Sequence, residues 1–187
     1  MPRRKHDFYE TPPHYLEALE EHICLHNVDT VLEPCVGEGA IEDWLRETFG
    51  CAVISNDLDH KRHATYHLDA AEARKLSNMV RDNAVNWVIT NPPFSLGFEI
   101  LTNLYSNLRV NYVFLVRISF NEPTMNPPRG LFLQANPPKM LIFLPRYSFR
   151  LNDKGQRQTD NVTCCWMGWG PSVPAGIFYS TIREGGK

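Results

Sequence analysis

The chain has 187 residues, a length that fits one domain with a sizeable core. Its net charge of −2 argues against a protein that coats nucleic acid, although it is compatible with contact to one short site. No apolar stretch reaches the length of a membrane span, and the basic N-terminus lacks the apolar segment of a signal peptide. Five cysteines without a Cys-x-x-Cys pattern argue against a disulfide framework or a zinc module. We therefore expect a single cytoplasmic domain over residues 1–187, with reduced thiols and no metal.

Predicted strands and helices alternate along the sequence. Thr11 offers a capping hydroxyl and is followed by prolines, which predicts a helix that begins there. The remaining elements are expected in this order: strand 30–32, helix 41–49, strand 51–55, helix 70–81, strand 85–90, helix 98–108, strand 112–118, helix 129–135, strand 139–144 and strand 162–168. Residues 61–68 are ambiguous, with at most a short strand that ends at Leu68. This alternation predicts an α/β fold with a largely parallel sheet, helices on both faces and an antiparallel pairing of the last two strands.

The motif Asn91-Pro92-Pro93-Phe94 directly follows the apolar run 85–90. An Asn side-chain oxygen and a Pro carbonyl can each accept one hydrogen of an exocyclic amine, which draws the lone pair of the amine out of conjugation. The prolines make the turn rigid, and Phe94 offers a face on which an extruded base can stack. The residues therefore predict a catalytic loop that methylates an amine on a nucleobase.

Asn-Pro-Pro occurs twice more, at residues 126–128 and 136–138. Neither copy is followed by an aromatic residue, and neither ends a clear apolar strand. We interpret both as turns.

The segment Glu33-Pro34-Cys35-Val36-Gly37-Glu38-Gly39 places a Gly-x-Gly turn at the end of the first strand. Such a turn lets the backbone approach a nucleotide-like ligand, and the missing third glycine argues against pyrophosphate. An acidic residue before the glycines suits the cationic methionine end of S-adenosylmethionine. Asp57 follows the second strand at the distance expected of a ribose-binding carboxylate, and Asp69 is a candidate acceptor for the adenine amine. The alternative for both is a surface turn or a helix cap.

Several other groups are interpreted as structural. His60, His63 and His67 lack a further ligand, and we expect them to be solvated rather than metal-bound. The adjacent Cys164 and Cys165 lie in an apolar strand, so at least one is expected in the core. Trp166 and Trp169 are expected in the core rather than as platforms for bases.

Together these motifs resemble the class I S-adenosylmethionine-dependent DNA methyltransferases that modify amino groups, especially the small phage-encoded adenine enzymes. The segments that carry the resemblance are Phe8-Tyr9-Glu10-Thr11-Pro12, residues 33–39, Asn56-Asp57, Asn91-Pro92-Pro93-Phe94, residues 115–120 and residues 145–149. The resemblance implies a Rossmann-like fold with a seven-stranded, largely parallel sheet and a C-terminal antiparallel strand. It implies transfer of a methyl group to N6 of adenine in double-stranded DNA whose target base is flipped, in the cytoplasm of the host if the protein is phage-encoded.

The resemblance also implies a set of site residues. The catalytic residues would be Asn91, Pro92, Pro93 and Phe94. The residues that bind S-adenosylmethionine would be Tyr9, Thr11, Pro12, Glu33, Pro34, Gly37, Gly39, Asp57, Asp69 and Asn91. Asn replaces Asp at the first catalytic position, which leaves the choice between adenine and cytosine less secure, while phenylalanine at the fourth position fits adenine better.

Contacts to DNA have weaker support in the sequence. Arg117, Arg146 and Arg150 near strand ends are candidates for phosphate contacts, with structural ion pairing as an equal alternative. No separate target-recognition domain is expected, so only the loops at 119–130 and 150–161 remain as candidates. Either the recognised site is short or a homodimer or another partner supplies the rest.

Two alternatives remain open. The same acceptor geometry serves RNA adenine, cytosine N4 and the amide of a protein glutamine. In a different class of function, the chain would be a catalytically silent module that binds DNA or S-adenosylmethionine.

Overall fold

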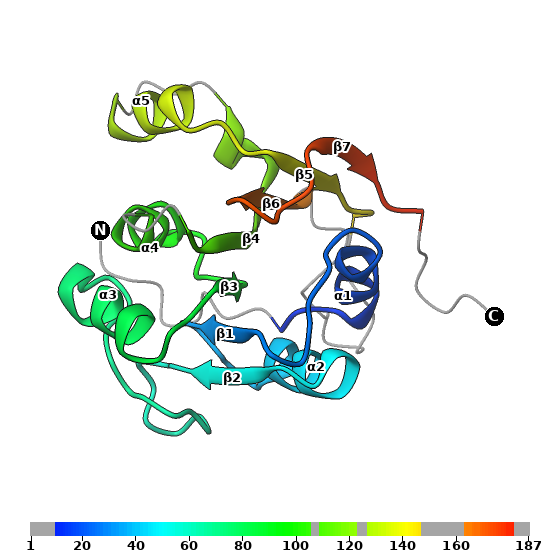
Figure 1. Ribbon diagram of the computed structural model, residues 1–187. Helices are drawn as coiled ribbons and strands as arrows, with labels where there is room; N and C mark the ends of the chain where they lie inside the picture. The colour runs from blue at the N-terminus through cyan, green and yellow to red at the C-terminus, as the bar shows by residue number, and fades with distance from the viewer. Residues whose placement is uncertain (1–9, 106–108, 123–126, 147–162, 182–187) are drawn as a thin grey trace, which may run out of the picture.

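The computed structural model describes residues 10–105, 109–122, 127–146 and 163–181. Its seven-stranded sheet has the order β2-β1-β3-β4-β6-β5-β7 (Figure 1). The strands are β1 (Thr30–Glu33), β2 (Ala52–Ser55), β3 (Trp87–Thr90), β4 (Asn111–Arg117), β5 (Met140–Phe143), β6 (Cys164–Trp169) and β7 (Gly176–Tyr179). β6 runs antiparallel to β4 and β5, and every other pair is parallel. The predicted largely parallel sheet and the antiparallel pairing of 139–144 with 162–168 are confirmed.

Helices cover both faces of this sheet. They are α1 (Pro13–Glu20), α2 (Ala40–Phe49), α3 (Ala73–Asp82), α4 (Gly97–Leu104) and α5 (Pro127–Ala135), with a short 3-10 helix, η1 (Ile118–Asn121), after β4. Figure 1 shows α1 and α2 on one face and α3 and α4 on the other. Each face has its own apolar core, and all residues of β3 are buried because helices lie on both sides. Within the described ranges, no helix combines the length and apolarity that a membrane crossing requires.

The seventh strand is one that the sequence analysis did not predict. Residues 61–68 form no strand, and Tyr66 makes only an isolated bridge with Asn56. The additional strand is β7, which pairs in parallel with β5. β7 has only four residues and follows Pro171 and Pro174, so its sequence resembles a loop.

The start of α1 also differs from the prediction. Its N-cap is Pro12, and no side chain caps it, so the capping role assigned to Thr11 is wrong. Proline occupies the first helical position, as expected. The Thr11 hydroxyl has a different partner at the strand ends, described below.

The two candidate recognition loops lie partly or wholly outside the described residues. Residues 119–130 include η1 and the start of α5, while 123–126 lie outside the described residues. Residues 150–161, with Arg150, lie wholly outside them, as does Tyr9.

Candidate active site

The carboxyl ends of β1, β2 and β3 meet at one edge of the sheet. β1 pairs in parallel with both β2 and β3, so the residues that follow these three strands are spatial neighbours. Glu33 ends β1, Ser55 ends β2 and Thr90 ends β3. In open α/β sheets this edge is where ligands bind. The glycine turn, Asp57 and the Asn91 motif therefore face a common region.

The glycine turn requires backbone conformations that other residues rarely adopt. Gly37 has φ +58° and Gly39 has φ +94°, both in the left-handed region. The N–H of Gly39 donates to the Val36 carbonyl at 2.9 Å. Gly39 is also the N-cap residue of α2. A Cβ on Gly39 would meet only Asp43 Oδ2, at 3.7 Å, so conformation rather than space demands glycine here.

Glu33 is the most unusual charged group of the site. Only 1% of its surface is exposed, and its Oε2 has no hydrogen-bond partner within the described residues. Burial, with Glu42 as the next cause, raises the pKa of this carboxyl well above its ordinary value of 4.5. A buried acceptor without a donor is costly unless a ligand supplies one. The cationic amine of the methionine end of S-adenosylmethionine would supply that donor, so Glu33 fits this cofactor.

Asp57 holds the glycine turn in place. Gly37 N–H donates to Asp57 Oδ2 at 2.9 Å, and Asp59 N–H donates to Oδ1 at 2.8 Å. A carboxylate oxygen accepts more than one hydrogen bond, so these contacts are compatible with binding of ribose hydroxyls. The ribose role of Asp57 stays a prediction.

Asn56 links three segments of the site. It is fully buried, and its Nδ2 donates to the carbonyls of Pro34 and Leu68, each at 3.0 Å. Its Oδ1 accepts from Leu68 N–H at 2.9 Å. Asn56 thereby fixes the segment that leads to Asp69 beside the glycine turn.

Asp69 forms the turn that precedes α3. Ala71 N–H donates to its Oδ1 at 2.9 Å, which is the turn role that the sequence allowed as an alternative. The side chain is half-buried, and a contact to the cofactor's adenine stays a prediction.

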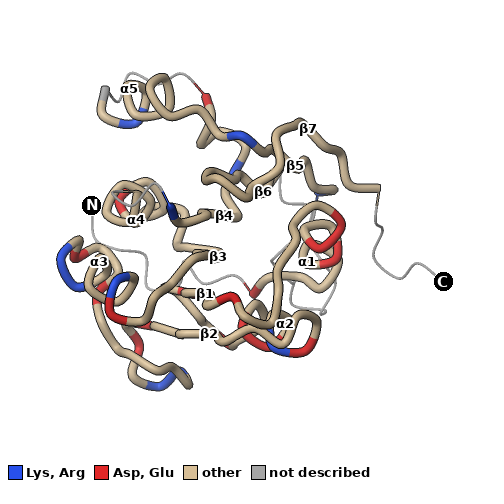
Figure 2. The backbone as a smooth tube through the Cα atoms, viewed as in Figure 1, with Lys and Arg blue, Asp and Glu red and all other residues tan. Residues whose placement is uncertain are grey.

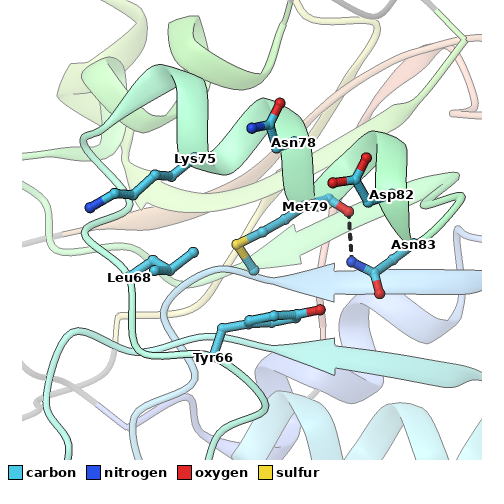
Figure 3. Close-up of a pocket in the computed structure, with 7 residues that line it drawn as sticks. All are labelled: Tyr66, Leu68, Lys75, Asn78, Met79, Asp82 and Asn83. Carbon is cyan, nitrogen blue, oxygen red and sulfur yellow. Dashed lines mark hydrogen bonds between the residues drawn. The ribbon is translucent and has the colours of Figure 1, made fainter.

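The segment before Asp69 is held between β2 and α3. Figure 3 shows that Tyr66 and Leu68 face Met79 of α3. Together with Lys75, Asn78, Asp82 and Asn83, these residues line a hollow of about 210 Å³. Tyr66 N–H donates to the Ser55 carbonyl at 3.0 Å, so this segment covers the outer edge of β2. None of the predicted site residues lines the hollow.

The loop after β2 also contacts the glycine turn. The Arg62 guanidinium donates to the Glu38 carboxylate and lies 3.8 Å from Asp59. This contact could not be predicted from the sequence, because Glu38 and Arg62 are 24 residues apart. The contact places Arg62 at the rim of the predicted cofactor site.

Asn91 is tied to the segment before α1. Its Nδ2 donates to Thr11 Oγ1 at 3.1 Å, and Thr11 is only 5% exposed. The structure therefore brings together two predicted site residues that are 80 positions apart. This bond explains why the Thr11 hydroxyl does not cap α1, and it fixes the orientation of the Asn91 amide. Pro12 is buried beside them.

The two prolines of the motif have different surroundings. The Pro93 carbonyl accepts from Leu96 N–H at 2.8 Å, which closes the turn that leads into α4. In the described part of the chain, no backbone N–H donates to the Pro92 carbonyl. A Cβ on Gly97 would lie 3.5 Å from Pro92 Cγ, an ordinary van der Waals contact, so α4 begins directly against the Pro92 ring.

Phe94 lies beside the end of β4. The Arg117 guanidinium lies over its ring, 4.7 Å from the centroid, and Phe94 is half-buried. Arg117 is exposed, and its contact with Phe94 places it beside the Asn91-Pro92-Pro93-Phe94 motif, which the sequence did not predict. Arg146 is also exposed and follows β5.

The remaining sequence interpretations concern residues away from this edge. Pro127 and Pro128 start α5, and Asn136 to Pro138 form the connection between α5 and β5, so neither motif copy ends a strand. Cys164, Cys165, Trp166 and Trp169 are all buried, as core residues are expected to be. His60 stacks on His67 with ring centroids 4.6 Å apart, and the described residues contain no cluster of three or more potential metal ligands.

Charge is unevenly distributed over the fold. Described residues 10–105 contain sixteen Asp or Glu and six Lys or Arg. Described residues from 109 onward contain one acidic residue, Glu122, and five basic ones: Arg109, Arg117, Arg129, Lys139 and Arg146. Figure 2 shows acidic segments on α1 and α2. The side of the sheet built from β1, β2 and β3, which includes the predicted cofactor turn, is acidic, and the side built from β4 to β7 is basic.

No protein-family model and no curated protein sequence matches this chain. Solved structures do match. A protein described as a modification subunit of a type I restriction enzyme from Vibrio vulnificus YJ016 superposes with a TM-score of 0.64 at 13% identity, over 96% of this chain and 48% of that one. The type I restriction-modification methyltransferase subunit from Streptococcus thermophilus gives 0.61 at 9% identity, over 91% and 46%.

A third match is the type IIG restriction endonuclease BpuSI, with a TM-score of 0.54 at 10% identity, over 96% of this chain and 28% of that one. The chain spans about half the length of the first two proteins. At such identities the likeness concerns the fold alone. The fold is the Rossmann-like fold of class I methyltransferases.

Proposed function

We propose that this protein transfers a methyl group from S-adenosylmethionine to the exocyclic amine of adenine in DNA. The observation that carries the proposal is the placement of Asn91 beside the glycine turn. Both follow neighbouring parallel strands, and Thr11 holds the Asn91 amide from the other side. Asn91, the proposed acceptor for the target amine, and the glycine turn, which is proposed to bind the cofactor, would therefore bring the amine and the methyl group close together.

The cofactor supplies an electrophilic methyl group when bound. Glu33 would receive its ammonium group, Asp57 its ribose hydroxyls, and Asp69 its adenine amine. Gly37 and Gly39 keep the backbone of the turn free of side chains. Pro34, Pro12 and Thr11 would line the methionine end, and Tyr9 is proposed on resemblance alone.

The protein's own part in the reaction is to orient the amine. The Asn91 side-chain oxygen and the Pro92 carbonyl would accept its two hydrogens and direct its lone pair toward the methyl group. Phe94 would stack on the extruded base, with the Arg117 guanidinium on the same ring. Proximity and electrostatics carry the rate enhancement, and the proton passes to solvent.

DNA is favoured over RNA and protein as the substrate. The basic side of the sheet suits a polyanion, and Arg117 and Arg146 are proposed phosphate contacts, with Arg150 as a third. Similar structures that are named as restriction-modification proteins point in the same direction. Adenine rests on the resemblance of the Asn-Pro-Pro-Phe motif. The resemblance also favours a phage-encoded enzyme that acts in the host cytoplasm.

The direct test is competition among DNA, RNA and peptide for labelled methyl groups, with Asn91→Ala as the matched variant. Asn91→Ala is expected to lower transfer to DNA by about 10²-fold or more, because one preorganised acceptor is lost. Binding of S-adenosylmethionine, measured by calorimetry, should change little. Asn91→Asp should retain transfer, because the Thr11 hydroxyl can donate to a carboxylate.

Two outcomes would contradict the proposal. Equal loss of cofactor binding and transfer in Asn91→Ala would remove the assigned role of Asn91. Binding of S-adenosylmethionine by the wild type without transfer to any acceptor would identify a silent binding module.

A further inference from the structure

A stacked pair of aromatic residues, a half-buried Phe143 and an exposed Tyr179, ends the last two parallel strands. Phe143 ends β5 and Tyr179 ends β7, and the two residues are register partners. Their ring centroids lie 5.1 Å apart with an interplanar angle of 19°, so the rings stack. Tyr179 is 73% exposed, which is unusual for a stacked aromatic residue in a strand. The pair presents an aromatic surface to solvent.

An open hollow of about 400 Å³ adjoins this pair. It is lined by Phe143, Leu144, Pro145, Tyr179, Ser180 and Thr181. None of the six is charged, and the last two carry hydroxyls. The volume falls in the range of small-ligand sites, about 300–1,000 Å³. Apolar rings with hydroxyls beside them match the chemistry of a nucleoside.

The structure holds this surface rigidly. Tyr15 OH donates to the Pro145 carbonyl at 2.8 Å, which ties the end of β5 to α1. On the opposite face of β7, Phe178 stacks on His22, with ring centroids 4.2 Å apart. Ser180 N–H donates to the Phe143 carbonyl at 2.9 Å and continues the pairing beyond β7. A ligand would therefore meet a preformed surface.

The aromatic pair lies at the same edge of the sheet as Asn91. β3, β4, β5 and β7 all run in the same direction, so their carboxyl ends share this edge. Four strand spacings of about 4.8 Å separate β3 from β7, which gives roughly 19 Å. At about 3.4 Å per nucleotide along one strand, this distance corresponds to roughly five or six nucleotides of DNA.

Charge identifies the occupant. Of the five basic residues in the described chain from residue 109 onward, Arg117 ends β4 and Arg146 follows β5, so both lie at this edge of the sheet. Arg109 and Lys139 precede the same two strands and lie at the opposite edge. Arg146 follows the hollow directly, one residue after Pro145. Aromatic surfaces beside cationic side chains bind the bases and the backbone of nucleic acid strands.

We propose that Phe143 and Tyr179 stack on a nucleotide of the substrate DNA outside the target base, with the flanking phosphate near Arg146. This contact rests on the proposed function and adds a second point of substrate recognition to it. It would favour DNA in which a nucleotide several positions from the target is unstacked or at an end.

The test measures binding of a short fluorescein-labelled DNA that contains a sequence methylated by the wild type, by fluorescence anisotropy. Tyr179→Ala is expected to weaken binding at least about fivefold, the lower limit for loss of one stacked base. Tyr179→Phe keeps the ring and should bind like the wild type. Ile177→Ala is the matched control, because Ile177 is 62% exposed on the same strand and two residues from Tyr179.

A readout of position accompanies the affinities. 2-Aminopurine is placed at successive positions of the same DNA, and its fluorescence is expected to change on binding at a position away from the target base. Tyr179→Ala should abolish that change and keep the change at the target base. S-adenosylmethionine binding should be equal in all variants.

Several results would overturn the proposal. These are unchanged DNA binding in Tyr179→Ala, equal losses in Ile177→Ala, and losses confined to RNA of the same sequence. A shift of sedimentation coefficient in Tyr179→Ala without DNA would assign the surface to a second copy of the chain. If the wild type neither binds nor methylates DNA, the proposed function fails together with this inference. If the wild type binds and methylates DNA, and Tyr179→Ala binds DNA with the same affinity, only this inference fails.

Discussion

Glu33 combines full burial with an acceptor oxygen that no described donor reaches. The sequence could identify it as an acidic residue before a glycine turn, but not that its carboxyl would be desolvated. Burial arises from the packing of the turn against α2, which brings Glu42 close enough to raise the pKa of Glu33 further. A cationic ligand would stabilise the ionised form of this carboxyl and offset the cost of desolvation, so the site is suited to one.

Glu33→Gln is expected to stabilise the free protein at neutral pH and to weaken binding of S-adenosylmethionine. Because the folded-state pKa is raised, the contribution of Glu33 to stability is fully present below about pH 4.5 and is lost as pH rises through the folded-state pKa. Glutamine does not titrate, so the difference in Tm between the variant and the wild type should grow as the pH rises above about 4.5. Thermal melts across pH, with the exposed Glu99→Gln as control, check this. A Tm difference that is independent of pH would contradict it.

Asn91 shows what sequence reasoning could and could not predict at a single residue. The motif and its position after a buried strand were sufficient to predict the loop. The partner was not, because Thr11 looks like a helix cap in the sequence and lies 80 residues away. Arg117 on the Phe94 ring is a similar case, since the contact depends on the pairing of β3 with β4.

Among the elements, the turn between β1 and α2 links fold and site most directly. Gly39 at φ +94° and Gly50 at φ +65°, which ends α2, both have left-handed backbones. A Cβ on either would have only an ordinary contact at 3.7 Å. The two glycines therefore provide a matched pair at opposite ends of one helix.

Gly39→Ala and Gly50→Ala are each expected to lower the free energy of unfolding by about 1–2 kcal/mol, the cost of a left-handed residue with a Cβ. Only Gly39→Ala should weaken binding of S-adenosylmethionine, because only Gly39 is in the predicted cofactor turn. Chemical denaturation and calorimetry measure the two effects. Equal cofactor affinity in both variants would argue against the turn as the cofactor site.

The buried apolar strands were predicted well, whereas the partly exposed edge strand β7 was not. β3 and β4 are buried on both faces, and their sequences show it as continuous apolar runs. β7 has four residues with alternating exposure, and its pairing depends on β5 rather than on its own sequence. The segment 61–68, which the sequence left ambiguous, lies along β2 but makes only one bridge, so the short strand considered there does not form.

At the scale of the whole molecule, the sheet separates two chemical environments. β1, β2 and β3 carry the acidic half, with the predicted cofactor turn, and β4 to β7 carry the basic half. The net charge of −2 hides this division, because the excess of eight acidic residues in positions 1–105 is largely offset by the excess of six basic residues in positions 106–187.

The central claim is methyl transfer to adenine in DNA. The most direct measurement is incubation of the protein with labelled S-adenosylmethionine and unmethylated genomic DNA, followed by nucleoside mass spectrometry. The account predicts label in N6-methyladenine, absent in the Asn91→Ala variant. Label in N4-methylcytosine would contradict the choice of base, and label only in RNA or protein would contradict DNA as the substrate.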